Sequence, residues 1–225
     1  MQENLKGKKM TADEMAAALA HEFKNPVALI KANVDYIKSC EKDDSLEKNF
    51  SLINRELMKI NNMISLLTEK TGSAYEEGIC DIVIADIIED ITNEYDISLK
   101  DKKISFLTIT EEDGISIKGE RSKLSILFYN IYKNAVESIE KRGNILTEIR
   151  RTGKRVIVEI KDNGSGISED EMRKIEKPFF TTKKNGSGLG LAICRSITAE
   201  HGGTMYIKNN DAGGTTVILI FKETM

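Results

Sequence analysis

The chain has 225 residues, 40% of them hydrophobic, so it can bury one large core or two modest ones. Its 33 basic and 36 acidic residues leave a net charge of -3, which creates no broad field to attract nucleic acid or an anionic membrane. No stretch reaches the ~18 apolar residues of a membrane-spanning helix, and the start lacks the apolar segment of a secretory signal. We therefore expect a cytoplasmic globular protein without nucleic-acid or membrane contacts, or the cytosolic core of a longer, membrane-anchored protein.

Two long helices are predicted at the beginning of the chain. Apolar residues recur at steps of three and four over residues 20–37 and 46–67, and the polar run 40–45 is short enough to join an antiparallel helical hairpin. Two helices alone enclose almost no core, so the apolar seam of one hairpin would remain in water. We expect a homodimer in which two hairpins form a four-helix bundle.

A histidine stands beside this seam. His21 follows the seam residue Ala20 by one position, about 100° around the helix, so we expect its imidazole to project toward solvent. Glu22 is its neighbour in sequence, and Asn25 lies four residues later on the same helical face. Pro26 removes a backbone donor and predicts a kink near the histidine. An unprotonated imidazole can attack phosphorus if an acceptor such as Glu22 holds the other ring proton.

Helices and strands alternate in the rest of the chain. In order, we expect a helix over 84–103, a strand over 104–109, a helix over 122–142, strands over 144–151 and 155–162, a helix over 189–201, and strands over 205–209 and 216–221. This order favours an α/β sandwich, in which helices cover one face of a mixed sheet. The expected organisation is a helical domain over 1–72, a hinge over 73–79 and an α/β domain over 80–225.

The first two of four blocks in this region suit a nucleotide. Asn130 and Asn134 are four residues apart and share a helical face, where their amide oxygens would meet magnesium and phosphate together. Asp162 ends a strand, and its carboxylate can accept a hydrogen bond from an exocyclic amine such as that of adenine. Gly164 and Gly166 follow in a turn that permits a close approach of the backbone.

The other two blocks lie just before and at the start of the last helix. Residues 177–185 contain Thr182 and Lys183, a hydroxyl and an ammonium that can reach phosphate. The glycine-rich run with Gly186, Gly188, Leu189 and Gly190 opens the helix, where backbone amides and the positive end of the helix dipole favour phosphate.

The run HEFKNP at residues 21–26 resembles the phosphotransfer segment of HisKA-type dimerisation domains in two-component sensor histidine kinases. The resemblance implies that His21 is the phosphoacceptor and that Glu22 assists removal of its proton. It also implies that Asn25 helps to dephosphorylate the partner, so that the chain has phosphatase activity as well. The implied partner is a response regulator, whose receiver domain carries an acceptor aspartate.

The four later blocks resemble, in order and spacing, the nucleotide-binding boxes of the histidine-kinase catalytic domain, which is shared with gyrase and the Hsp90 chaperones. The resemblance implies ATP and Mg2+ as ligands, with Asn134 as the metal ligand, Asn130 beside the phosphates and Asp162 as the adenine reader. It implies that Thr215 reaches adenine through water. Residues 177–185 would form a lid that brings Thr182 or Lys183 to the phosphates, and the glycines at 186, 188 and 190 would shape the phosphate loop.

At one position the chain differs from the ATPases and serine kinases of this superfamily. They carry a glutamate as general base where this chain has Asn130, so transfer of phosphate to water or to a serine hydroxyl is poorly supported. Two alternatives to a kinase stay open, namely a catalytically silent ATP-binding scaffold and an ATP-driven conformational machine. Glu120 is expected to be a poor cap for its helix, and His201 to cap the last helix as a cation.

Overall fold

The computed structural model describes residues 23–24, 26–36, 53, 60, 78–98, 102–175, 177, 180–183, 188–211 and 213–223. By internal contacts the chain divides into two compact units, Met1–Thr71 and Gly72–Met225. In the first unit, residues 23–24, 26–36, 53 and 60 are helical, as expected for those segments. The loop of the predicted hairpin and the residues His21, Glu22 and Asn25 lie outside the described residues. No helix in the described part is long and apolar enough to cross a bilayer.

The second unit contains two sheets and four helices within the ranges described. In chain order the elements are β1 Cys80–Val83, α3 Ile84–Ser98, β2 Lys103–Thr110, β3 Ser116–Gly119, α4 Arg121–Ser138, β4 Arg142–Thr152, β5 Arg155–Asp162, α5 Glu169–Met172, α6 Gly190–Glu200, β6 Thr204–Asn209 and β7 Thr215–Lys222. β1 and β3 pair antiparallel as a small sheet of two strands.

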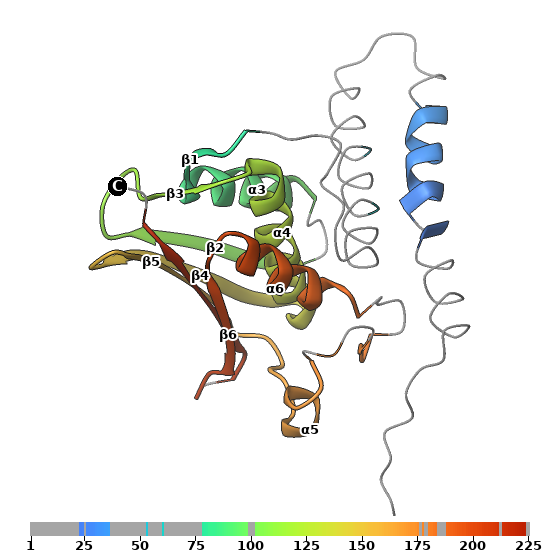
Figure 1. Cartoon of the computed structure of the whole chain (residues 1–225). Coiled ribbons are helices and arrows are strands. Elements are labelled where there is room, and N and C mark those ends of the chain that lie inside the picture. The colour runs from blue at the N-terminus through green and yellow to red at the C-terminus, as the bar shows by residue number, and fades with distance from the viewer. Residues whose placement is uncertain are drawn as a thin grey trace, which may run out of the picture. The chain divides into compact units, whose positions relative to one another are not determined.

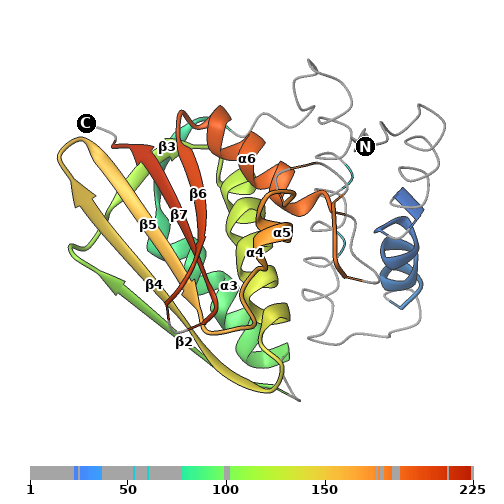
Figure 2. The same ribbon diagram turned by 90° about the horizontal axis from the view of Figure 1, so that it is seen from below.

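The larger sheet has five strands in the order β2-β4-β5-β7-β6. Its β2–β4 pair is parallel and its other pairs are antiparallel, which confirms the predicted mixed sheet. Figures 1 and 2 show α3, α4 and α6 together on one face of this sheet. The expected arrangement of helices on a single face is therefore confirmed for the described elements.

The core lies between this sheet and these helices, and it is filled by apolar side chains that recur at regular spacings along each element. β5 alternates strictly, with Val156, Val158 and Ile160 turned toward the helices and fully or nearly fully buried. The helices meet them with apolar residues three and four apart, such as Leu124, Leu127 and Ile131 of α4. Because Asp162 continues the alternation of β5, its side chain also lies on the inner, helix-covered face.

Two helix ends differ from the prediction. α3 ends at Ser98 and β2 begins at Lys103, so the predicted helix over 84–103 was too long. α4 ends at Ser138, whereas apolar spacing had predicted a helix through 142. Ile139 is extended and its side chain is buried. Lys102 Nζ donates to the carbonyl oxygen of Ile139 at 2.5 Å and to that of Val136 at 2.8 Å. The lysine satisfies carbonyls that a longer helix would have bonded internally.

Candidate functional site

The carboxylate of Asp162 is the most heavily engaged polar group of the predicted site. It is only 8% exposed at the end of β5. Its Oδ1 atom accepts from the backbone N–H of Gly164 at 2.9 Å, from that of Thr215 at 3.2 Å and from the Ser138 hydroxyl at 3.2 Å. Burial raises the pKa of this carboxyl above its ordinary value, although the three hydrogen bonds act in the opposite direction.

The two oxygens of Asp162 therefore differ. The donors from Gly164, Thr215 and Ser138 all converge on Oδ1, which leaves Oδ2 outside these three contacts. A single acceptor oxygen in a partly desolvated position is suited to one neutral N–H donor of a ligand. Such an acceptor fits the exocyclic amine of adenine, which donates an N–H.

The backbone of the glycine turn lies against the end of α4. A Cβ added at Gly164 would stand 2.0 Å from Ser138 Oγ and 2.8 Å from the Ser138 carbonyl carbon, so only glycine fits there. The Ser165 amide donates to the Ser138 carbonyl at 3.1 Å. The next residues are held by β6, because the Ile167 amide donates to Asn209 Oδ1 at 2.9 Å. The turn with Gly164 and Gly166 is thus held by α4 on one side and by β6 on the other.

Asn130 faces the glycine-rich start of α6. Its Nδ2 donates to the Ile126 carbonyl at 3.0 Å, one turn back in α4. A Cβ added at Gly190 would lie 3.5 Å from Asn130 Oδ1, so the first residue of α6 is in contact with this amide. Gly188 has φ of 67°, the left-handed region, and Leu189 is a buried N-cap residue without a side-chain cap hydrogen bond. The glycine run does open a helix, as predicted, and Gly186 lies outside the described residues.

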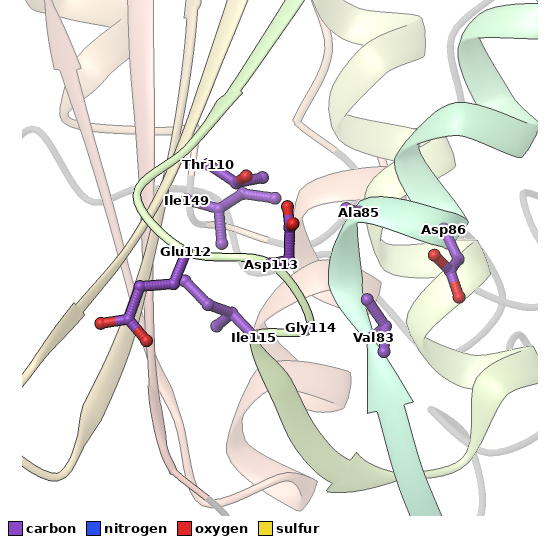
Figure 3. A pocket seen from close by; sticks show the side chains of 9 residues that line it. All are labelled: Val83, Ala85, Asp86, Thr110, Glu112, Asp113, Gly114, Ile115 and Ile149. Carbon is purple, nitrogen blue, oxygen red and sulfur yellow. The ribbon is translucent and has the colours of Figure 1, made fainter.

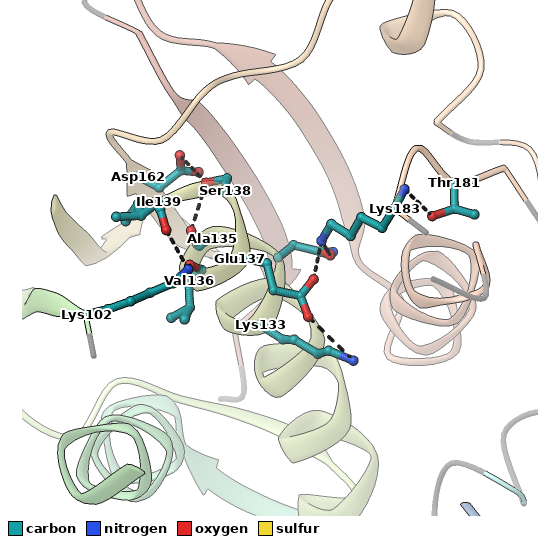
Figure 4. A network of polar contacts seen from close by, with 11 residues as sticks. Lys102, Lys133, Ala135, Val136, Glu137, Ser138, Ile139, Asp162, Thr181 and Lys183 are labelled. Atoms are coloured by element: carbon teal, nitrogen blue, oxygen red, sulfur yellow. Dashed lines mark hydrogen bonds and ion pairs between the residues drawn. The ribbon is translucent and has the colours of Figure 1, made fainter. Parts of the chain in front are cut away.

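Asn134 contacts the predicted lid. Lys183 Nζ donates to Asn134 Oδ1 at 3.1 Å and to Glu137 Oε2, and Figure 4 shows the lysine extended toward the Glu137 carboxylate. The Lys183 amide is held by Thr181 Oγ1 at 3.1 Å. Thr182 is exposed and makes no hydrogen bond with a described residue. The structure thus brings Lys183 to Asn134 but leaves Thr182 apart.

These contacts follow one stripe along α4. Asn130 meets Gly190, Asn134 meets Lys183, and Ser138 meets both Asp162 and Gly164. The three α4 residues are four positions apart, on one face, and the stripe is about 12 Å long at 1.5 Å rise per residue. One helix face therefore carries an amine acceptor at one end and a helix N-terminus at the other, with amide and carboxylate oxygens between them. This is the layout that a nucleoside triphosphate with its metal requires.

Ser138 was not predicted as a residue of the site, although it lies four residues after Asn134 and therefore on the same helical face. The other contribution that was not foreseen is the Thr215 main chain. Thr215 was expected to reach adenine through water, and the structure adds that its amide donates to Asp162 Oδ1 at 3.2 Å.

A cavity of about 240 Å³ in the same unit lies away from this stripe, and Figure 3 shows its lining. Its wall includes the buried Ile115 and Ile149 together with the acidic residues Asp86, Glu112 and Asp113. None of the predicted nucleotide residues lines the cavity, so it is separate from the stripe.

The expectations for His201 and Glu120 are settled by their contacts. His201 is the C-cap residue of α6, as predicted. Its Nε2 accepts from the Glu120 amide at 3.2 Å, and its Nδ1 lies 2.7 Å from the Ile197 carbonyl oxygen. Glu120 makes no side-chain cap for α4 and pairs with Lys123 at 2.8 Å instead.

Residues 119–225 match the family described as histidine kinase-, DNA gyrase B-, and HSP90-like ATPase. The fold agrees with this match. The catalytic domain of the histidine kinase ThkA superposes with a TM-score of 0.60 at 28% identity, over 65% of this chain and 97% of that domain. The second unit thus has the α/β fold of a histidine-kinase catalytic domain.

Curated relatives of this chain include a sporulation kinase and a sensor histidine kinase. Sporulation kinase D of Bacillus subtilis is 28% identical over 91% of this chain and 40% of its own length. The sensor histidine kinase ZraS of Salmonella typhimurium is 30% identical over 93% of this chain and 45% of its own. ThkA in complex with its response regulator TrrA matches 94% of this chain and 61% of that chain, with a TM-score of 0.60 at 25% identity. The chain therefore spans less than half the length of both curated relatives.

Proposed function

We propose that the chain is a protein-histidine kinase, which transfers the γ-phosphoryl group of ATP to His21 and from there to an aspartate of a response regulator. The observation that carries the proposal is the stripe on α4. Along one face of this helix lie the carboxylate of Asp162, the side-chain oxygen of Asn134 and the glycine-rich start of α6, which suit adenine, a metal ion and phosphate in turn. The sequence match over residues 119–225 and the sensor-kinase relatives support it.

In this proposal the nucleotide lies along the stripe. Asp162 Oδ2 accepts from the adenine amine, while Gly164 and Gly166 let the backbone approach the base. Gly186, Gly188, Leu189 and Gly190 bring backbone amides to the phosphates. Asn130 closes the phosphate end of the stripe, and Thr182 and Lys183 cover it.

Magnesium is the cofactor that the donor set fits, because amide and carboxylate oxygens are its preferred ligands. Asn134 Oδ1 would hold it on α4. When bound, Mg2+ neutralises charge on the phosphates, and catalysis then depends mainly on positioning. The chain's own residues orient the γ-phosphoryl group toward the acceptor.

The phosphoryl acceptor in this proposal is His21 of the helical unit. An unprotonated nitrogen of His21 attacks the γ-phosphorus, a nitrogen–phosphorus bond forms, and the bond to the bridging oxygen breaks to release ADP. Glu22 accepts the proton that the other ring nitrogen shares, and Asn25 positions water for dephosphorylation of the partner. The apolar Val27 is 53% exposed in the single chain, which supports a homodimer in which another hairpin covers the seam.

Asn130 favours histidine as the acceptor. A carboxylate at this position would serve as a base for water or a hydroxyl, but an amide has no such basicity. Imidazole needs no base to expose its lone pair, so transfer to His21 remains efficient while hydrolysis is slow. A response-regulator receiver domain is the proposed partner, as ThkA forms a complex with TrrA.

The proposal is tested by incubating the purified protein with Mg2+ and γ-labelled ATP. We expect acid-labile, base-stable label on the wild type and none on His21→Gln. Absence of label on a wild type that binds ATP would favour the silent scaffold. Steady ATP hydrolysis that survives His21→Ala would favour the conformational machine.

A further inference from the structure

The contact between Lys183 and α4 involves one residue that the proposed function leaves without a role. Glu137 is three residues after Asn134, so both side chains leave α4 on the same face. The ammonium of Lys183 donates to Asn134 Oδ1 at 3.1 Å and to Glu137 Oε2. One cation is thus shared by an amide oxygen and a carboxylate oxygen at the middle of the stripe.

We infer that Asn134 and Glu137 together form the divalent-cation site of the nucleotide pocket, and that the Lys183 ammonium holds this site until the metal-bound nucleotide displaces it. The inference rests on the proposed function, since it names a second metal-binding residue for the same pocket. Both oxygens already converge on one positive charge, which is the arrangement that a hard divalent cation needs.

The energetics favour displacement over a fixed ion pair. The side chains of Lys183 and Glu137 are 43% and 38% exposed, so their pairing is weakened by water and is readily exchanged. Mg2+ carries twice the charge of an ammonium and is bound tightly to the triphosphate. Lys183 and the metal compete for the same two oxygens, and binding of one releases the other.

An ordinary surface ion pair is the competing explanation, and the chain offers a matched control. Lys133 lies 3.8 Å from Glu137 Oε1, with 46% of its side chain exposed, so both lysines neutralise the same carboxylate. Lys133 makes no hydrogen bond to Asn134 among the residues that the structure describes. Only Lys183 therefore competes for both oxygens of the inferred site.

The discriminating quantity is the metal preference of nucleotide binding. We define it as the Kd of adenosine imidotriphosphate in EDTA divided by its Kd in Mg2+, both from calorimetry on the full chain. Glu137→Gln removes a charged ligand of the metal, so the preference should fall about tenfold. Binding in EDTA should not weaken, because a negative charge beside the phosphates has been lost.

Lys183→Met should change the same ratio in the opposite direction. With Mg2+ the variant lacks the competitor, so metal-bound nucleotide binds more readily. Without metal the triphosphate carries its full negative charge, and the loss of a nearby ammonium weakens binding. Both effects raise the metal preference. Charge alone would move the ratio in the same two directions, because each substitution changes the charge beside the phosphates. The deciding value is therefore the Kd in Mg2+ of Glu137→Gln, which should rise if the carboxylate binds the metal and should fall if Glu137 only pairs with lysines.

Lys133→Met should leave the metal preference within about twofold of the wild type, as expected for an exposed pair. The inference is overturned if Glu137→Gln leaves the preference unchanged, if Glu137→Gln does not raise the Kd in Mg2+, or if Lys133→Met raises the preference as Lys183→Met does. A wild type that binds no nucleotide in either buffer would overturn the proposed function as well. Normal wild-type binding with unresponsive variants would overturn the inference alone.

Discussion

Asp162→Asn separates adenine recognition from folding. Asparagine keeps an Oδ1 acceptor for the Gly164, Thr215 and Ser138 donors, but replaces the second oxygen with an NH2 group. A hydrogen bond to a charged acceptor is worth about 1.5–3 kcal/mol, so we expect adenosine imidotriphosphate to bind ten- to a hundredfold more weakly, on the order of these energies. The stability of the fold should stay the same or rise, because a buried charge is removed.

The inosine analogue makes the assay specific. Inosine carries a carbonyl oxygen where adenosine carries the amine, so the new amide can donate to it. Calorimetric titration with both imidotriphosphates should therefore show that the adenine preference of the wild type is lost or reversed in Asp162→Asn. Adenosine binding within about twofold of the wild type would refute the assignment, since that is less than one neutral hydrogen bond. Equal losses for both bases would also refute it.

The same variant tests the raised pKa of Asp162. A carboxyl whose pKa is raised by folding above 3.8 binds its proton more tightly in the folded than in the unfolded state. The wild type should therefore lose stability as pH rises from about 3.8 through the raised value, whereas Asp162→Asn lacks this loss. The melting temperature of the variant relative to the wild type should increase over that window. A difference independent of pH would contradict the pKa direction.

Three further variants test the support of the site by chemical denaturation and nucleotide titration. Gly164→Ala forces its Cβ against Ser138, and should cost about 1–3 kcal/mol of stability and weaken nucleotide binding; wild-type affinity would contradict the close approach. Lys102→Met leaves two carbonyl oxygens at the end of α4 without their donor, and should cost about 1–2 kcal/mol; an unchanged unfolding midpoint would remove its capping role. Tyr132→Phe breaks the buried 2.5 Å hydrogen bond to Thr147 and should cost about 1–2 kcal/mol without changing nucleotide affinity. Altered affinity in that variant would show coupling between core and site.

Strong periodicity made much of the fold predictable. Alternation in the sequence predicted β5 with its observed bounds, Arg155–Asp162. The last helix and the two strands after it were also predicted close to their observed bounds. The strands β1 and β3 were missed because four residues are too few to display a period. The short α5 was missed, although Ser168 and Glu171 form a capping box that spacing could have revealed.

The parts of the site that escaped prediction depend on contacts between distant segments. Lys183 reaches Glu137 across 46 positions, and no local pattern specifies that pairing. His201 was predicted only as a cap of its own helix, but its Nε2 also accepts from the amide of Glu120, which lies 81 positions away in the sequence. In both cases the tertiary fold, rather than helix spacing, selects the partner of the charged or titratable group.

The most direct test of the account is a single-turnover experiment with excess protein, Mg2+ and γ-labelled ATP, quenched over time. The account predicts that label leaves ATP and appears one for one on the imidazole of His21, with ADP as the other product and almost no free phosphate. Addition of a cognate receiver domain should then move the label from histidine to aspartate. Release of label as inorganic phosphate, while peptide mapping finds residue 21 unmodified, would contradict the account.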